Sequence, residues 1–337
     1  MNATGIMRLC EGRVSSEALA HVAAEIAAVE KELARNIKSQ VALVQKIGAH
    51  TLEAGGKRLR PAFVTLAAGA TGQPYDPERT RRLGACMEMV HMATLIHDDV
   101  IDHAATRRGR PTASSVFGNA PAILTGDVLL SRAMAILAHD GDLAIIQNVS
   151  NAVVELAEGE VRELETRGEF GLTREEHFDI LRMKTAVFIQ SCCEIGAIAA
   201  GATGAVVDAV GRYGHHVGMA FQMVDDLLDY RGDHLATGKP RATDFREGCA
   251  TLPLILLREH LRDAELAEIA KTFGNGVDEE SIARVCGLMA DRGTFDAAEA
   301  AARRHVVEAI QSLAGLPDGE ARHLLEAVAE VVVAREA

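Results

Sequence analysis

The 337-residue sequence has little aromatic character: it contains no Trp, 3 Tyr and 9 Phe. Its apolar residues are mainly Ala, Leu, Val and Ile, which suit packed helices. Hydrophobic residues make up 48% of the chain. That share is ample for a sizeable core and excludes an intrinsically disordered protein.

Positive charge and long apolar runs are also scarce. The 35 basic residues are outnumbered by 48 acidic ones, which gives a formal charge of −13. Because proteins hold phosphate backbones with basic surfaces, we expect no nucleic-acid partner. The longest stretch without Asp, Glu, Lys or Arg covers 16 residues, Pro111 to Gly126, and two prolines and two glycines interrupt it. We therefore expect no transmembrane segment.

The six cysteines form no C-x-x-C pair, and no His-rich spacing accompanies them. This pattern excludes the common structural zinc sites. Residues 1–13 lack a basic region followed by a sustained apolar core, so we expect no secretory signal. Reduced thiols and a cytoplasmic location fit these features best.

Helical periodicity dominates the chain. It predicts helices over residues 16–38, 81–103, 127–139, 143–165, 174–200, 206–231, 252–272, 279–292, 295–314 and 319–337. Period-two strands bounded by turn residues are absent, and no Ser/Pro-rich linker marks a boundary. We predict an all-α protein, a single domain over residues 1–337, built as one large helical bundle around a central cavity.

Two aspartate clusters each end an apolar helix. The first is His97-Asp-Asp-Val-Ile-Asp102, and the second, Asp225-Asp-Leu-Leu-Asp229, has the same spacing. On a helix each D-D-x-x-D cluster places its carboxylates on one face, where like charges repel unless a cation lies among them. Two copies would arise by chance in roughly one chain in 300. Carboxylates in groups of two or three suit Mg²⁺, which shares its shell with water and phosphates.

Basic residues lie where a phosphate binder would use them. The segment Gly55-Gly-Lys-Arg-Leu-Arg-Pro61 combines two glycines, three cations and a Pro expected at a first helical position. Arg107 and Arg108 follow the first cluster closely. Lys184, in an apolar helix, should meet an anion, either a ligand or a Glu or Asp of the chain. His91 lies two turns before Asp98, on the same helix face, and is either a ligand contact or a satisfied core residue.

Together these segments resemble the trans-polyprenyl diphosphate synthase family, most closely its long-chain octaprenyl and decaprenyl members. The resemblance also rests on Gly126-Asp127, Lys184-Thr-Ala186, Phe221 to Tyr230, and Gly238-Lys-Pro240 with Asp244 and Thr251-Leu-Pro253. It covers about residues 50–260. It implies an isoprenoid synthase fold, a homodimer, and about three Mg²⁺ ions per site with diphosphate bound.

The resemblance also implies roles for individual residues. It implies metal ligands, direct or through water, at Asp98, Asp99, Asp102, Asp225, Asp226 and Asp229. It implies that Arg107, Lys184 and Lys239 hold the allylic diphosphate, and that Lys57, Arg58, Arg60, His91 and Arg108 bind isopentenyl diphosphate. Thr185 and Gln222 would line the reacting centre. The residues expected to be catalytic are Asp98, Asp99, Asp102, Lys184, Thr185, Gln222 and Asp225.

Product length should depend on the helix before the first cluster. Its lining positions, Thr94, Ala93 and Val90, carry no aromatic side chain, whereas short-chain members of the family block the tunnel with Phe or Tyr. We expect a product of about eight to ten isoprene units, such as a quinone side-chain precursor. Close helix packing is the other explanation for small residues at Ala93 and Thr94.

Two positions depart from the family pattern: Cys249 stands where Lys is common, and Glu163 where Gln is frequent. The alternatives are a short-chain farnesyl or geranylgeranyl diphosphate synthase, a class I terpene cyclase, and a non-catalytic regulatory subunit of a heteromeric synthase. The low aromatic content disfavours the cyclase. The two complete clusters disfavour the regulatory subunit.

Overall fold

The computed structural model describes residue 10 and residues 12–232 and 241–334. Its tertiary contacts group the chain into two compact units. Unit 1 comprises residues 1–151, 191–211 and 313–328, and unit 2 comprises residues 152–190, 212–312 and 329–337. The single-domain prediction stays a prediction, and each unit is described by itself.

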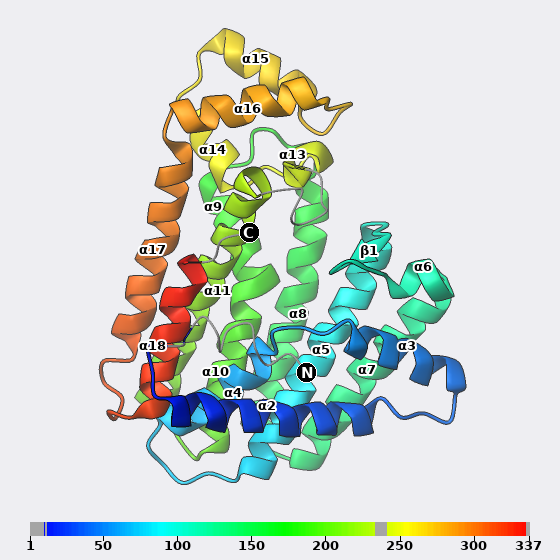
Figure 1. The fold of residues 1–337 in the computed structure, drawn as a ribbon, viewed down its shortest axis with the longest axis vertical. Coiled ribbons are helices and arrows are strands. Elements are labelled where there is room, and N and C mark those ends of the chain that lie inside the picture. Colours follow the sequence, from blue (N-terminus) through cyan, green and yellow to red (C-terminus); the bar gives the residue numbers. More distant parts are fainter. Residues whose placement is uncertain (1–9, 11, 233–240, 335–337) are drawn as a thin grey trace. The chain divides into compact units, whose positions relative to one another are not determined.

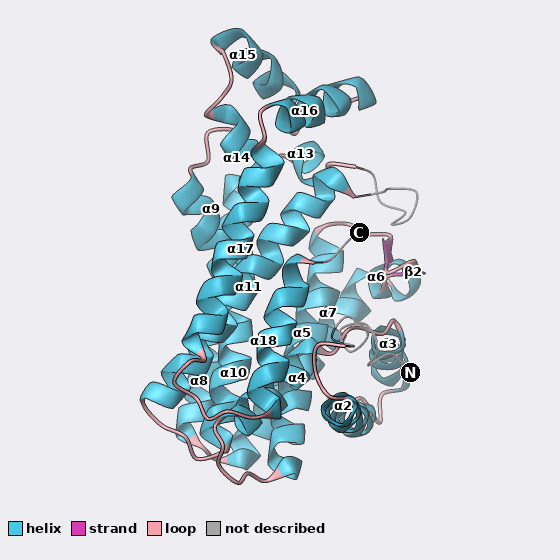
Figure 2. Ribbon diagram, turned by 60° about the vertical axis from the view of Figure 1, so that its left-hand side comes forward, coloured by secondary structure: helices cyan, strands magenta, loops and turns pink. Residues whose placement is uncertain are grey.

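Most of the described residues lie in helices, which confirms the predicted all-α class (Figures 1 and 2). Unit 1 contains α2 (Ser16–Asn36), α3 (Ala42–Glu53), α4 (Leu59–Ala70), α5 (Pro77–Ile101), α6 (Ala113–Phe117) and α7 (Asn119–Asp140). Unit 2 contains α9 (Arg174–Leu181), the π-helix η1 (Arg182–Ala186), α13 (Thr243–Glu247), α14 (Leu252–Arg258), α15 (Asp263–Thr272), α16 (Glu279–Asp291) and α17 (Thr294–Ser312). Residues of both units occur in α8 (Leu143–Thr166), α10 (Val187–Ala199), α11 (Ala205–Arg231) and α18 (Glu320–Val333).

Helix α5 is the centre of unit 1 and packs against α2, α4 and, most extensively, α7. Asp76 caps its first turn through the backbone N–H of Glu78, and Pro77 follows as the first helical residue. Every residue from Leu83 to Val90 is buried. This buried stretch fixes the direction of α5 and therefore of the aspartates at its C-terminal end.

The periodicity missed α3, α4, α6 and α13, joined α14 and α15 into one helix over residues 252–272, and misplaced Pro61. Nine of the twelve α4 residues are buried, so the helix has no polar face for an amphipathic pattern to reveal. Pro61 is its third residue, because α4 begins at Leu59. The predicted helix over residues 174–200 is also interrupted, by η1.

One short ladder was not predicted from the sequence. Strands β1 (Thr106–Arg107) and β2 (Arg110–Pro111) pair antiparallel through two residues each. Arg108 and Gly109 form the turn, and both have positive φ, 53° and 72°, as the tight two-residue hairpins require. Two-residue strands are too short for an alternating pattern to detect.

Within the described part of the chain, α7 is long and apolar enough to cross a membrane by length and composition. A single helix that meets these criteria is weak evidence for a span, because core helices meet them too. α7 lies along α5 and carries Asp127 and Arg132 within its length (Figure 1).

A histidine pair joins α11 and α17 in unit 2. Nδ1 of His216 lies 2.9 Å from Nδ1 of His305, so one ring must donate and the other accept. Burial lowers the pKa of His305 to about 4. The charges of protonated His216 and His215 and of Arg304 act in the same direction. Burial also lowers the pKa of His216. The pair is therefore neutral in the folded protein at neutral pH.

The pair predicts a loss of stability in acid. An unfolded His takes up its proton near pH 6.5, whereas folded His305 resists protonation down to about pH 4. The free energy of unfolding should therefore fall as the pH drops from about 6.5 to 4. We expect His305→Asn to flatten this fall by about 1–2 kcal/mol, discounted for partial exposure of the ring. Urea unfolding of both proteins at pH 7, 5.5 and 4.5 measures the free energy of unfolding. An equal fall with pH in both proteins would contradict the prediction.

Candidate functional site

The C-terminal end of α5 carries the first aspartate cluster. Asp98 is half-buried and Asp102, the C-cap residue, is exposed, four residues further along the same face. Asp99 differs: it is buried, and its Oδ1 accepts a hydrogen bond from Nε of Arg107 at 2.7 Å. The cluster thus presents Asp98 and Asp102 outward, while Asp99 holds Arg107.

The β1–β2 hairpin is fixed on the end of α3. Nη1 of Arg108 donates to the carbonyl O of Gly55, and Nη1 of Arg110 donates to the carbonyl O of Glu53 at 3.0 Å. Nε2 of His50 lies 2.8 Å from the carbonyl O of Pro111. These contacts hold the arginines of the hairpin beside the Gly55-Gly56 turn.

Arg58, which we expected to contact substrate, lies inside the protein in an ion pair with Glu88. Its side chain is 4% exposed, and Nη1 donates to Oε1 of Glu88 at 2.9 Å, itself 4% exposed. Nη2 also donates to the carbonyl O of Leu52, and Nε lies 3.4 Å from Oε1 of Glu30. Its backbone has φ 48°, a left-handed conformation that is costly without Gly. Arg58 therefore anchors the basic segment from inside.

The basic residues of unit 1 surround a small cavity of about 30 Å³. Arg58, Glu88, His91, Asp99, Arg107 and Arg108 are among the residues that line it. Burial, and after it the charges of Arg60 and the three other arginines, lowers the pKa of His91 well below its usual value. His91 is therefore neutral and can donate one N–H. Lys57 is exposed and Arg60 half-buried on the same basic segment.

Sequence reasoning missed Glu88. Its buried ion pair with Arg58 predicts that a substitution at Glu88 strongly lowers the free energy of unfolding. Glu88→Gln leaves the buried Arg58 without its closest carboxylate, so we expect a loss of about 2–4 kcal/mol of unfolding free energy. The matched control is Glu78→Gln on the same helix. Glu78 is 79% exposed and 4.0 Å from Arg82, so its loss should cost less than about 0.5 kcal/mol. Urea unfolding compares the two, and similar midpoints would contradict the prediction.

In unit 2, η1 carries Lys184 and Thr185 between two glycines that sequence reasoning also missed. A Cβ on Gly159 would lie 2.7 Å from Cβ of Met183, and a Cβ on Gly218 would lie 2.5 Å from Cα of Ala186. The backbones of α8 and α11 thus approach η1 more closely than any side chain allows. Isolated glycines within helical patterns were the available signal.

Lys184 meets acidic residues of the chain, one of the two partners that we expected. Nζ contacts Oε2 of Glu163 and lies 3.2 Å from Oε2 of Glu160. Although burial acts to lower it, the charges of Glu163 and Glu160 raise the pKa of Lys184. Glu163, a position that departs from the family pattern, therefore holds the lysine by an ion pair.

Gln222 connects Thr185 of η1 to Asp226 of the second aspartate cluster. Oγ1 of Thr185 donates to Oε1 of Gln222 at 2.9 Å, and Nε2 of Gln222 donates to Oδ1 of Asp226 at 3.2 Å. The buried His177 places Nε2 3.1 Å from Oδ2 of Asp226. That contact lacks hydrogen-bond geometry, so Oδ2 is buried without a hydrogen-bond partner in the described structure. Thr185 and Gln222 lie together as expected, and His177 was not foreseen.

Asp229 accepts hydrogen bonds from the backbone N–H groups of Thr243 and Asp244, at 3.1 and 3.0 Å. Asp229 thereby caps α13. This capping role distinguishes it from Asp225, which is half-buried on α11, the helix that carries both residues. Burial, and after it Asp229 and Asp226, raises the pKa of Asp244 well above its usual value. Buried carboxylates with raised pKa values indicate a site that lacks compensating positive charge.

The remaining predicted residues are placed more simply. Val90 and Ala93 are fully buried in α5, and Thr94 is half-buried. Cys249 is half-buried, and burial raises the pKa of its thiol to about 12. Lys239 lies outside the described residues.

These donors fit a hard divalent cation. All the predicted ligands are carboxylate oxygens, and Asp226 has a buried oxygen without a hydrogen bond. In the described residues, no three His, Cys, Asp or Glu side chains enclose a metal position by themselves. An ion held by either aspartate cluster would need further oxygens from water or a bound phosphate. Mg²⁺ is commonly coordinated in this way.

Comparison with known proteins agrees with this chemistry. Residues 41–289 match the polyprenyl synthetase family. The chain is 36% identical over 312 residues to heptaprenyl diphosphate synthase component 2 of Geobacillus stearothermophilus, covering 93% of this chain and 96% of the relative.

Two solved structures are similar over nearly their whole length. A decaprenyl diphosphate synthase from Rhodobacter capsulatus has a TM-score of 0.90 and 34% identity, covering 99% of this chain and all of that one. A polyprenyl synthase from Caulobacter crescentus, complexed with calcium and isoprenyl diphosphate, has a TM-score of 0.90 and 32% identity over all of both chains. The chain therefore belongs to the polyprenyl synthetase family and is, like its relatives, a prenyltransferase with the all-α isoprenoid synthase fold.

Proposed function

We propose that the protein condenses isopentenyl diphosphate with an allylic diphosphate and so elongates an all-trans polyprenyl diphosphate. The observation that carries this proposal is that His91, Arg107 and Arg108 lie together around one recess near the aspartates at the end of α5. A diphosphate needs this combination of cations and neutral donors. The similarity to prenyl diphosphate synthases supports the assignment.

The proposal gives each unit its own task. In unit 1, Lys57, Arg60, His91 and Arg108 bind isopentenyl diphosphate, and Asp98 and Asp102 belong to the metal-binding set. In unit 2, Asp225, Asp226 and Asp229 bind metal, and Lys184 and Lys239 contact the allylic diphosphate. In unit 1, Arg107 has the role of a diphosphate contact. Bound Mg²⁺, about three ions per site, would neutralise the departing diphosphate.

The remaining chemistry follows from positioning and charge. The allylic C–O bond ionises as positive side chains take up the negative charge that develops on the diphosphate. The double bond of isopentenyl diphosphate, held by the basic segment, attacks the allylic carbon. A proton then leaves the neighbouring carbon, with the released diphosphate as its acceptor. Lys184 has three N–H donors, and Glu163 and Glu160 take two of them, so the third serves the diphosphate.

We propose a long-chain product of about eight to ten isoprene units. Relatives named heptaprenyl and decaprenyl diphosphate synthase support a long chain. The absence of aromatic side chains at Thr94, Ala93 and Val90 supports it as well.

Thr94→Phe is expected to shorten the product to about three or four units, because an aromatic ring would fill the path of the growing chain. Ala93→Phe should do the same, and Thr94→Val, which keeps the volume, should leave the length unchanged. Chromatography of the dephosphorylated products measures this. Full-length product from both Phe variants would contradict the proposed path.

The activity itself is tested with Mg²⁺, labelled isopentenyl diphosphate and farnesyl or geranylgeranyl diphosphate as primer. Elongation to long products is expected. No elongation with either primer would overturn the enzyme assignment for this chain alone, and wild-type product of three or four units would favour the short-chain alternative.

The name of one relative favours a second candidate. Since that relative is called component 2 of heptaprenyl diphosphate synthase, the second candidate is a subunit that needs another protein for its activity. Both aspartate clusters are complete, which favours a catalytic role. Activity of the purified chain would exclude the need for another component.

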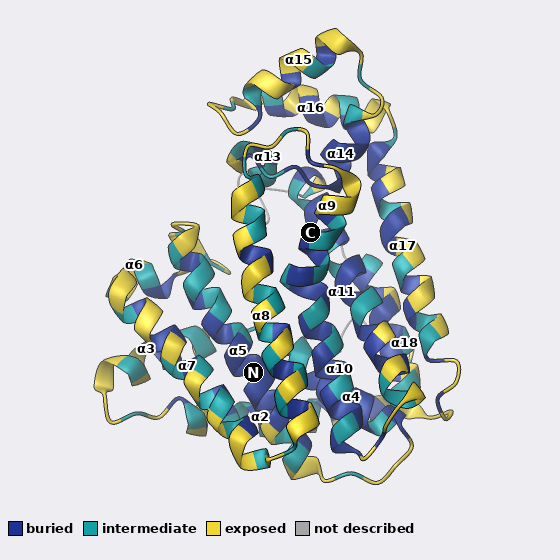
Figure 3. Cartoon of the chain, turned by 180° about the vertical axis from the view of Figure 1, so that it is seen from behind, coloured by how far each residue is buried: buried dark blue, intermediate teal, exposed yellow. Residues whose placement is uncertain are grey.

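We further propose a cytoplasmic homodimer. The six cysteines are free thiols, as expected in a reducing compartment. Helix α8 has many exposed positions (Figure 3). Four of its exposed residues are apolar, namely Leu143, Val154, Val161 and Leu164. Such a row on one helix is typical of an interface. Sedimentation of the purified protein measures the oligomeric state.

A further inference from the structure

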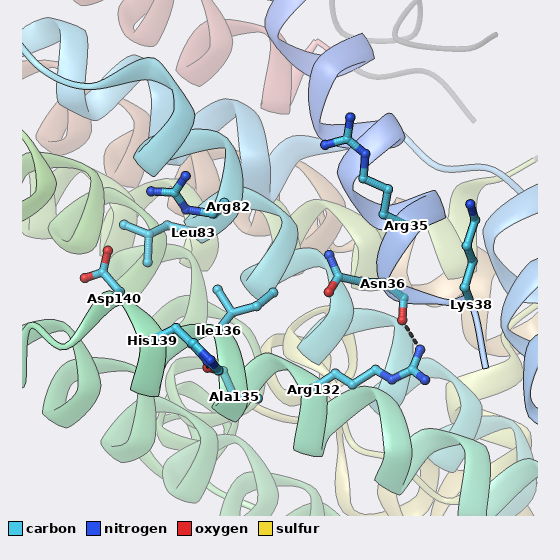
Figure 4. Close-up of a pocket in the computed structure, with 10 residues that line it drawn as sticks. All are labelled: Arg35, Asn36, Lys38, Arg82, Leu83, Arg132, Ala135, Ile136, His139 and Asp140. Atoms are coloured by element: carbon cyan, nitrogen blue, oxygen red, sulfur yellow. Dashed lines mark hydrogen bonds between the residues drawn. The ribbon is translucent and has the colours of Figure 1, made fainter. Parts of the chain in front are cut away.

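Unit 1 has a second, larger cavity of about 660 Å³ at the opposite end of α5 from the aspartates. It is lined by the last turn of α2, the start of α5 and the last turns of α7 (Figure 4). Arg82 and His139 lie across the space from Arg35 and Lys38, and Arg132 lies below them. None of these residues belongs to the proposed catalytic machinery.

The cavity gathers more positive charge than the protein neutralises. Arg132 and Lys38 form no ion pair within the described residues. Arg35 pairs with Glu32 at 3.1 Å but is 73% exposed. Arg82 pairs with Glu78 only at 4.0 Å. Exposed pairs of this kind contribute little attraction.

The negative groups at the cavity do not neutralise its cations, because they are paired with other residues or carry only partial charge. Asp140 is the lining carboxylate, and Arg79 holds it with two hydrogen bonds of 2.8 Å. The C-terminal ends of α2 and α7 each add about half a negative charge. Together they offset roughly one of the four Lys and Arg charges. A net positive charge remains in a space of ligand size.

Arg132 is also held in place. Its Nη1 donates to the backbone carbonyl O of Asn36, the last residue of α2 (Figure 4). The guanidinium therefore stands at a fixed position between α2 and α7. Fixed arginines bind phosphate groups better than mobile ones because less side-chain freedom is lost on binding.

We propose that this cavity binds a phosphate-bearing anion at a site separate from catalysis. The chemistry is that of a phosphate or diphosphate group, carried either by a free anion such as inorganic diphosphate or by the headgroup of an acidic phospholipid. Four cations line this one space, and the fork of N–H donors on an arginine matches the oxygens of such a group.

The test compares the wild-type protein with Arg82→Glu/Arg132→Glu. The control, Lys271→Glu/Arg304→Glu, makes the same charge change at exposed positions of unit 2. Inorganic diphosphate is titrated calorimetrically in the presence of EDTA. Vesicles of phosphatidylglycerol and phosphatidylcholine, or of phosphatidylcholine alone, are tested by co-sedimentation. Binding events at the catalytic site are common to all three proteins, so the difference between them reports on this cavity.

We expect the cavity variant to lose at least ten-fold in affinity for one probe, while the control keeps it. Loss for diphosphate identifies a free anion, and loss for acidic vesicles identifies a headgroup. Unchanged binding of both probes, or equal loss in the control, would overturn the proposal. Arg82→Ala/Arg132→Ala replaces the variant if it does not fold. Prenyl transfer in detergent should stay within two-fold of wild type, which separates this outcome from failure of the proposed function.

Discussion

Asp98→Ala should lower the rate of prenyl transfer by about 10³-fold, because it removes a group that stabilises the charge developing on the leaving diphosphate. The same change should not harm the fold. Asp98 lies in the last turn of α5 beside Asp99 and Asp102, and negative charge at a helix C-terminus is unfavourable. We therefore expect the free energy of unfolding to rise by about 0.3–1 kcal/mol.

Steady-state assays over a range of Mg²⁺ concentrations and urea unfolding measure the two effects together. Asp291→Ala, an exposed aspartate at the end of α16, is the matched control and should keep wild-type activity. Activity within ten-fold of wild type for Asp98→Ala would remove the residue from the site. A loss of activity that parallels a loss of stability would indicate a structural role instead.

Gly218→Ala is expected to cost about 2–3 kcal/mol of unfolding free energy, the range for overpacking. The new Cβ would lie 2.5 Å from Cα and 3.0 Å from Cβ of Ala186, and backbone cannot yield as a flexible side chain does. Because α11 would have to move away from η1, Lys184 and Thr185 should also be displaced and activity should fall.

Gly287→Ala provides the opposite result from the same substitution. Gly287 lies inside α16, and a Cβ there meets no atom within 4 Å. Since Ala is the better helix former, this variant should gain about 0.5–1 kcal/mol. Urea unfolding of both variants measures the two changes in unfolding free energy. If Gly218→Ala left this free energy unchanged, η1 would not be confined as described.

The sequence predicted the helical class and the segments of the site because both depend on local spacing. Two aspartates four residues apart share a helix face wherever the helix lies. The role of Arg58 could not be predicted in this way. Its inward direction depends on a left-handed backbone and on Glu88, thirty residues away, and no local pattern encodes such a pair.

The same distinction explains the other unforeseen residues. His177 contacts Asp226 only because α9 folds against α11, and Gly159 matters only because η1 passes it. Asp229 and Asp225 look equivalent in the sequence, yet the N-terminus of α13 engages only Asp229. Tertiary packing, not residue type, separates these roles.

The discontinuous build of unit 1 also sets an order of events during synthesis. Residues 313–328 belong to this unit, and Ala321 packs so closely on Gly69 of α4 that an added Cβ would lie 3.0 Å from it. Ser15, just before α2, also donates a hydrogen bond to Glu320. The half of the molecule that begins at the N-terminus must therefore wait for α18 to leave the ribosome before it can close.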